Sequence, residues 1–197
     1  MVLKMLRERD REVLNYINEY NAITIKQASR LFYKDVKCKY DRARKRLKQL
    51  EEQNILQSYI SKFNNEKVYC LDKKLSAHDL YVLELYSLLI ENNCEILEFK
   101  TQPLYLKKQI RPDAFIKFRH DNLIYLIFVE VDLTHFTSLN KYQTYEMLYR
   151  TEELQSKYGT FPIIVVVGDN PIEYESCNFD IVYLSFKDID IHKIIYE

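Results

Sequence analysis

The sequence has little glycine and little proline, with 2 Gly and 4 Pro among its 197 residues. Flexible and extended linkers are rich in these residues, so the chain offers little linker material. No apolar run approaches the roughly 18 residues that cross a bilayer. The amino-terminal stretch MVLKMLRERDRE becomes charged at once, without the apolar core of a signal peptide. We therefore expect a cytoplasmic protein with no membrane segment.

Closely spaced cysteine or histidine ligands are also missing. The cysteines, Cys38, Cys70, Cys94 and Cys177, form no Cys-x-x-Cys pair, and the four histidines show no ligand spacing. Zinc ribbons and redox-active cysteine pairs need close spacing. We therefore expect no structural zinc, and we expect reduced, mostly buried thiols.

The net charge is zero, but the charges are unevenly distributed. Residues 1–50 hold 14 Lys or Arg and 6 Asp or Glu, a balance of +8, and the remaining residues hold 15 and 23, a balance of −8. An excess of basic residues at one end suits a polyanionic partner. The hydrophobic fraction of 47% and the charged fraction of 29% are typical of folded proteins. The asymmetry favours two domains, over residues 1–72 and 76–197.

The first domain is predicted to contain three helices followed by a hairpin. Apolar residues at helical spacing predict helices over 6–20, 25–33 and 40–54. Thr24 is suited to cap the second helix. In the third helix, the stripe expected to face inward consists of Tyr40, Ala43, Leu47 and Leu50. Alternation before and after a turn at Asn64–Asn65 predicts the hairpin.

This order of elements is that of a winged helix, whose third helix enters the major groove while the hairpin lies on the backbone. The candidate DNA contacts are Arg42, Lys45 and Arg46 for base edges or nearby phosphates, and Arg44, Lys48, Lys62 and Lys67 for phosphates. The alternative is a solvated basic helix in an ordinary α+β protein. The element order and the basic hairpin favour binding to double-stranded DNA.

The second domain is predicted to mix one sheet with helices. A helix over 77–93, capped by Ser76, precedes three strands over 94–101, 111–119 and 122–134. A long helix over 138–159 ends at Gly159, and two further strands follow over 161–169 and 179–186. The fold class is therefore α+β: an N-terminal winged helix-turn-helix, then a mixed α/β domain with the element order of PD-(D/E)XK nucleases.

Acidic residues on two successive predicted strands are the candidate catalytic residues. Asp113 precedes one strand and Glu130 lies in the next, so pairing of the strands would bring both acids to a Mg²⁺ ion. Asp132 takes the position where an active nuclease would carry lysine. Lys117 shares a strand face with Asp113 and is the first candidate for the missing lysine, and Lys141 is the weaker one.

Two further acids and one alternative stay open. Glu84 or Glu91, on the preceding predicted helix, could add another carboxylate to the site. The alternative is that Asp113 and Glu130 lie at strand ends and face water or a basic side chain.

The chain resembles the replication-relaxation family of plasmids and integrative conjugative elements. The resemblance rests on RPDAFIKF at 111–118, FVEVDLTHF at 128–136, and the later helix with Lys141 and Tyr145. Glu130, Val131, Asp132 and Thr134 match the family pattern, whereas Leu133 and His135 depart from it. The resemblance implies a winged helix with a PD-(D/E)XK-like domain, DNA binding, and Asp132 as the family's own residue.

Three functions are consistent with these features. The first is a DNA-binding accessory protein of plasmid replication or conjugative mobilisation, whose non-cutting second domain serves as a scaffold for a relaxase, a replication protein or a second copy. The second is a Mg²⁺-dependent endonuclease that uses Asp113 and Glu130. The third is a transcriptional regulator whose second domain dimerises or senses a ligand.

Overall fold

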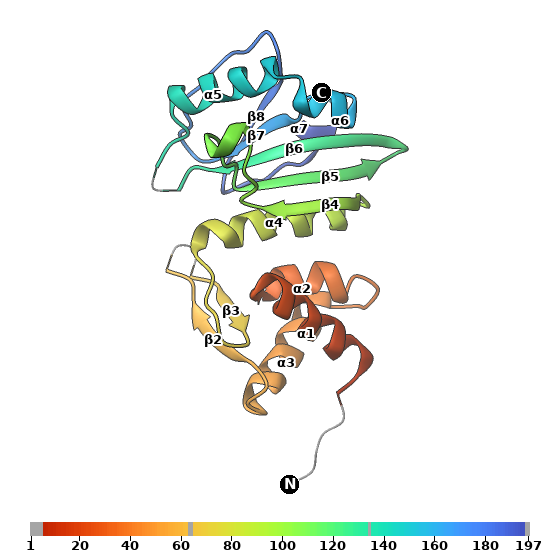
Figure 1. Ribbon diagram of the computed structural model, residues 1–197. Coiled ribbons are helices and arrows are strands. Elements are labelled where there is room, and N and C mark those ends of the chain that lie inside the picture. The colour runs from red at the N-terminus through yellow and green to blue at the C-terminus, as the bar shows by residue number, and fades with distance from the viewer. Residues whose placement is uncertain (1–5, 63–64, 134, 196–197) are drawn as a thin grey trace. The chain divides into compact units, whose positions relative to one another are not determined.

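The computed structural model describes residues 6–62, 65–133 and 135–195. The chain has a mixed α+β architecture and divides into two compact units, Met1–Glu91 and Asn92–Glu197 (Figure 1). This division falls later than the boundary at 72–76 expected from the sequence. The difference arises because the helix after the hairpin packs on the N-terminal unit.

The N-terminal unit contains four helices and three short strands. In chain order these are α1 (Glu8–Tyr20), β1 (Ala22–Thr24), α2 (Ile25–Phe32), α3 (Lys39–Glu52), β2 (Gln57–Ile60), β3 (Lys67–Cys70) and α4 (Ala77–Glu91). The strands form an antiparallel sheet in the order β1-β3-β2. The sequence did not predict β1, because three residues are too few to show alternation.

Local sequence explains how α2 and α3 are placed. Thr24 ends β1 and caps α2, since its hydroxyl accepts the Gln27 N–H at 3.2 Å while the Gln27 side chain accepts the Thr24 N–H at 3.0 Å. On α3, Ala43, Leu47 and Leu50 are buried in the core, as their spacing predicts. Tyr40 is 46% exposed, so its predicted inward position is wrong. Tyr40 lies in the first turn of α3, before the first residue of the helix that is buried in the core, Ala43.

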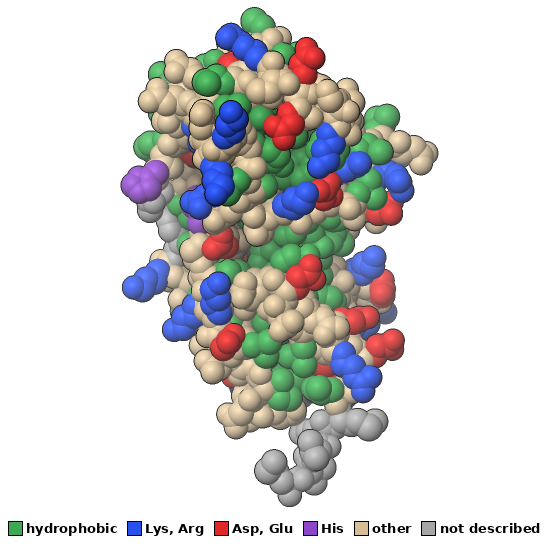
Figure 2. Space-filling view, in the orientation of Figure 1, with side chains coloured by type: hydrophobic (Ala, Val, Ile, Leu, Met, Phe, Trp, Pro, Cys, Tyr) green, Lys and Arg blue, Asp and Glu red, His purple; other side chains and the backbone are tan. Residues whose placement is uncertain are grey.

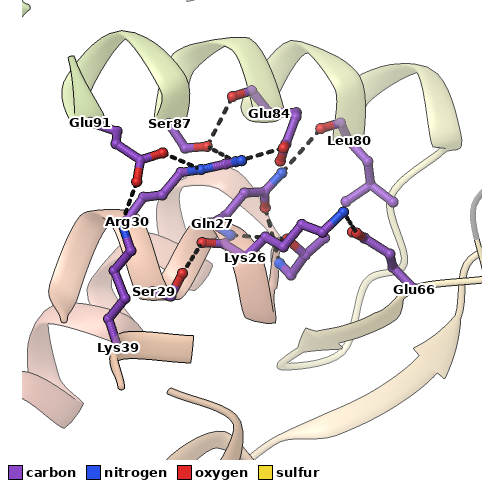
Figure 3. A network of polar contacts seen from close by, with 11 residues as sticks. Lys26, Gln27, Ser29, Arg30, Lys39, Glu66, Leu80, Glu84, Ser87 and Glu91 are labelled. Atoms are coloured by element: carbon purple, nitrogen blue, oxygen red, sulfur yellow. Dashed lines mark hydrogen bonds and ion pairs between the residues drawn. The ribbon is translucent and has the colours of Figure 1, made fainter. Parts of the chain in front are cut away.

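Polar contacts fix α4 to α2 (Figure 3). The Arg30 guanidinium of α2 binds the carboxylates of Glu84 at 2.6 Å and Glu91 at 2.7 Å, and donates to the Ser87 hydroxyl at 3.2 Å. The buried Gln27 side chain donates to the Leu80 carbonyl at 3.1 Å. Arg30 therefore engages both Glu84 and Glu91 within the N-terminal unit. The structure gives neither residue the role of the additional carboxylate that the sequence left open.

The C-terminal unit is built on a five-stranded sheet. Its elements are β4 (Glu95–Thr101), the short helix η1 (Leu106–Lys108), β5 (Ala114–His120), β6 (Leu123–Val131), α5 (Leu139–Arg150), α6 (Glu153–Tyr158), β7 (Ile163–Val167), β8 (Ile181–Leu184) and α7 (His192–Ile195). The strand order is β4-β5-β6-β7-β8, with antiparallel pairing up to β6 and parallel pairing after it. The mixed sheet agrees with the sequence-based prediction.

Helix α5 lies on one face of this sheet (Figure 1). Its buried residues Tyr142, Tyr145 and Leu148 pack against the aromatic and aliphatic side chains of the strands, including Phe115 and Phe128. Strand residues alternate between faces, so Glu130 projects toward α5 as Phe128 does. The predicted single helix over 138–159 is broken at Glu152, whose φ of 56° is left-handed, and α6 ends at Gly159 with a φ of 88°.

Two sequence-based expectations on composition have different outcomes. All four cysteines are free, but only Cys70 and Cys94 are buried, whereas Cys38 and Cys177 are exposed. The expectation of mostly buried thiols is therefore only half right. In the part of the chain that the structure describes, no helix is both long and apolar enough to cross a membrane.

Candidate functional site

Strand pairing brings Asp113 beside Glu130. Ala114 pairs with Val129 across β5 and β6, and the Asp113 N–H donates to the Val129 carbonyl at 2.9 Å. The Asp113 carboxylate in turn accepts the Val131 N–H at 2.8 Å. Asp113 is thereby held between the two residues that flank Glu130 in the sequence.

Glu130 is buried, 2% exposed, and both of its carboxylate oxygens are engaged from α5. One oxygen forms an ion pair with the Lys141 ammonium, and the other accepts the Tyr145 hydroxyl at 2.5 Å. Burial raises the pKa of Glu130 to about 7, the negative charge of Asp113 adds to this rise, and Lys141 and Tyr145 oppose it. Burial, followed by the Glu130 charge, also raises the pKa of Tyr145.

Asp132 shapes the segment that follows β6. Its N–H donates to the Val167 carbonyl at 2.8 Å, and its Oδ1 accepts both the N–H and the hydroxyl of Thr137, at 2.9 and 2.7 Å. Asp132 is 6% exposed, and its Oδ2 has no hydrogen-bond partner among the described residues. A Cβ atom at Gly168 would lie 2.8 Å from the Asp132 Cβ, so only glycine fits there. Thr134, part of the family pattern, lies outside the described residues.

The lysine beside the acids is Lys141, and Lys117 lies elsewhere. Lys117 pairs with Leu126, four residues before Glu130 along β6, which is roughly 13 Å at the rise of a strand. Its ammonium lies 5.5 Å from the centre of the Tyr158 ring. The sequence placed Lys117 ahead of Lys141, and the structure reverses that order.

The arrangement does not fit a catalytic Mg²⁺ ion. No group of three or more His, Cys, Asp or Glu side chains within residues 6–62, 65–133 and 135–195 is arranged to hold a metal. A cation at Glu130 would have to share the carboxylate with the Tyr145 hydroxyl and with the Lys141 ammonium, whose positive charge repels it. No catalytic step through a metal follows from this arrangement.

The second candidate site lies on the basic third helix. Its solvent-facing cations are Arg42, Arg44, Lys45 and Lys48. Arg44 lies 3.5 Å from Asp41 and Lys48 lies 3.5 Å from Glu52. Such exposed pairs contribute little to stability and exchange readily with solvent. These cations are therefore accessible to an external anion.

Arg46 has a different environment from the other basic residues of α3. Its guanidinium forms a fork with the Asp10 carboxylate of α1, at 2.6 and 2.5 Å, and also donates to the Gln49 side chain at 3.0 Å. Asp10 is 2% exposed and also accepts the Arg7 N–H at 2.7 Å. Although burial acts to raise it, the Arg46 and Arg7 contacts lower the pKa of Asp10. Arg46 therefore joins α3 to α1, and its contact with base edges or nearby phosphates stays a prediction.

A cavity of about 410 Å³ opens beside Asp10, and we call it the basic hollow. It is lined by Arg7, Arg9, Asp10, Tyr33, Val36, Lys37, Arg42, Lys45, Arg46 and Gln49. The basic pattern of α3 did not point to Arg7, Arg9 or Lys37, because these residues lie outside that helix. The stretch RERD at the start of α1 was the available signal, since it places Asp10 among basic residues.

The hairpin lysines differ from each other. Lys62 is exposed. The predicted turn at Asn64–Asn65 follows it, and residues 63–64 lie outside the described residues. The Lys67 ammonium is 2.6 Å from the Glu51 carboxylate of α3 and 5.2 Å from the centre of the Tyr69 ring. Lys67 therefore ties the hairpin to α3.

Acidic and basic side chains are interspersed on the face drawn in Figure 2. Of the basic residues in 1–50, those that line the basic hollow are Arg7, Arg9, Lys37, Arg42, Lys45 and Arg46. The chain matches no protein-family model, and comparison with curated proteins and with solved structures finds no similar protein.

Proposed function

We propose that the protein binds double-stranded DNA through its N-terminal unit and that α3 is the helix that enters the major groove. The observation that carries this proposal is the division of α3 into two sides. Ala43, Leu47 and Leu50 are buried, while Arg42, Arg44, Lys45 and Lys48 face solvent. The helix can therefore present cations to DNA without exposing its apolar stripe.

The order of elements supports the same proposal. Helices α1 to α3, with β1 before α2 and the β2–β3 hairpin after α3, follow the order of a winged helix. In this proposal Arg42 and Lys45 contact base edges or nearby phosphates, and Arg44 and Lys48 contact phosphates. Lys62, at the hairpin, contacts the DNA backbone.

For the C-terminal unit we propose a scaffold with the fold of PD-(D/E)XK nucleases but without cleavage. Three antiparallel strands, a helical crossover and a parallel strand match that element order. The engagement of both Glu130 oxygens by Lys141 and Tyr145 supports loss of metal binding. The motif resemblance to the replication-relaxation family favours a role in plasmid replication or conjugative mobilisation, with a relaxase, a replication protein or a second copy as partner.

Fluorescence anisotropy with a labelled duplex tests the DNA-binding proposal. The double variant Arg42→Gln/Lys45→Gln should raise the Kd by at least about tenfold, because two charge-assisted contacts are lost. Lys187→Gln/Lys193→Gln is the matched control, since it removes the same charge from exposed positions of the C-terminal unit. Equal losses in the two double variants would mean that net charge, and not α3, controls binding.

A further inference from the structure

The basic hollow gathers cations from three segments of the N-terminal unit. Arg7 and Arg9 come from the start of α1, Lys37 from the connection between α2 and α3, and Arg42, Lys45 and Arg46 from α3. The one carboxylate among the lining residues, Asp10, is already bound to Arg46 and to the Arg7 backbone. The remaining positive charges therefore converge on the cavity without an internal counter-ion of their own.

Converging like charges repel one another, and an anion in the cavity relieves that repulsion. Guanidinium groups suit a phosphate in particular, because their N–H donors match its oxygen atoms in pairs. Asp10 contributes indirectly, since its fork to Arg46 and its bond to the Arg7 N–H fix two lining segments against each other. The hollow is thus preorganised for an anion by contacts within the protein.

We propose that the basic hollow binds a phosphate group of the DNA backbone, beside the contacts that α3 makes in the groove. This inference rests on the proposed DNA binding and adds a specific phosphate site to it. Arg42 and Lys45 line the hollow and also face solvent on α3, so one strand of a bound duplex can occupy both. The site recruits residues of α1 and of the α2–α3 connection to DNA binding.

A free nucleotide is the other source of a phosphate. Its base would need an apolar or aromatic surface to stack on. Tyr33 is the one aromatic residue among the lining residues, but it is 6% exposed and the Arg9 guanidinium lies 4.9 Å from its ring centre. The hollow therefore offers a nucleotide its phosphate contacts but little for its base, which favours the DNA backbone.

The test uses variants that leave α3 untouched. Arg9→Gln/Lys37→Gln removes two cations that line the hollow, and Arg11→Gln/Lys34→Gln removes two exposed cations from the same two segments that do not line it. Duplex binding by the full chain is followed by fluorescence anisotropy over a series of NaCl concentrations. The hollow variant should raise the Kd at least about tenfold over the control and flatten the plot of log K against log [salt] by about 1.

The outcomes separate the inference from the function on which it rests. If the hollow variant binds DNA as the control does, while Arg42→Gln/Lys45→Gln still loses affinity, the hollow is not a DNA phosphate site and DNA binding by α3 stands. If the wild type binds no duplex, the proposed function itself fails. Thermal unfolding checks the fold of each variant. If the double variant is destabilised, Lys37→Gln compared with Lys34→Gln decides, because both side chains are exposed.

Titration of the wild type with ATP and with inorganic phosphate distinguishes the two sources. The inference predicts that both bind weakly and that ATP gains little affinity from its base, because the hollow contacts the phosphate and offers the base little surface. Tight ATP binding that Arg9→Gln/Lys37→Gln abolishes, together with unchanged DNA binding in that variant, would overturn the assignment to the DNA backbone.

Discussion

The Lys141 ammonium of α5 is ion-paired with the buried Glu130 carboxylate of β6. Together with the Tyr145 hydroxyl, it engages both oxygens of that carboxylate. Asp113 lies beside Glu130, while Lys141 and Tyr145 fill the space around the Glu130 carboxylate. This ion pair leads to two predictions, one on the cleavage of plasmid DNA and one on the protonation of Glu130.

We expect no cleavage of supercoiled plasmid by the purified protein in the presence of Mg²⁺ or Mn²⁺. The physical reason is that a metal would have to share the Glu130 carboxylate with the Lys141 ammonium, whose positive charge repels it. Gel electrophoresis of the plasmid measures nicking and linearisation. Metal-dependent cutting that disappears in Asp113→Ala would contradict the scaffold proposal, whereas cutting that persists in this variant would indicate a contaminating nuclease.

Glu130 should make stability fall as the pH rises. Burial raises its pKa in the folded protein to about 7 from the ordinary value of 4.5 for a glutamate. The folded state therefore holds a proton that the unfolded state releases, so the stabilisation is complete below about pH 4.5 and is lost as the pH rises to about 7. Between these limits, the difference in unfolding free energy between wild type and Glu130→Gln should change by on the order of 3 kcal/mol. A constant difference would show that Glu130 is ionised throughout.

Removing Arg46 should destabilise the fold rather than only weaken DNA binding. Arg46→Met leaves the buried Asp10 carboxylate without its ion-pair partner, which costs about 3 kcal/mol or more. Arg44→Met is the matched change on the same helix, and it should alter stability by less than about 1 kcal/mol because its pair is exposed. Urea denaturation followed by circular dichroism measures both. Similar stabilities for the two variants would argue against the Asp10–Arg46 link.

A fragment that ends after α4 should be more stable than one that ends before it. Residues 1–91 retain the Arg30 contacts to Glu84 and Glu91 and the burial of Leu80 against Ala22 and Val68. A fragment of residues 1–72 loses these contacts and leaves Arg30 without both carboxylates. Thermal unfolding compares the two fragments. Equal melting temperatures would favour the boundary at 72–76 expected from the sequence.

The helices and strands could be predicted because their periodicity is local. The spacing of Ala43, Leu47 and Leu50 indicates the inner side of α3, and the alternation before Glu130 indicates β6. The same reasoning placed Asp113 next to Glu130 through antiparallel pairing. It misplaced Tyr40, because periodicity defines a direction on a helix and not how far the core extends along it.

The partners of long side chains could not be predicted in the same way. Asp10 and Arg46 are 36 residues apart in sequence, and only the packing of α1 on α3 brings them together. The sequence offered both Lys117 and Lys141 as candidates for the lysine beside Glu130. The register of β5 and β6 places Lys117 too far along the strand, and the position of α5 over the sheet brings Lys141 within reach.

The central claim is that α3 and its neighbouring cations bind the phosphates of duplex DNA, and the salt dependence of binding tests it most directly. Anisotropy titrations of the wild type with a labelled random-sequence duplex, repeated over a series of NaCl concentrations, give the slope of log K against log [salt]. Contacts to about four to six phosphates predict a slope of about −4 to −5, since each contributes about −0.9. Weak binding with a slope near zero would contradict the account.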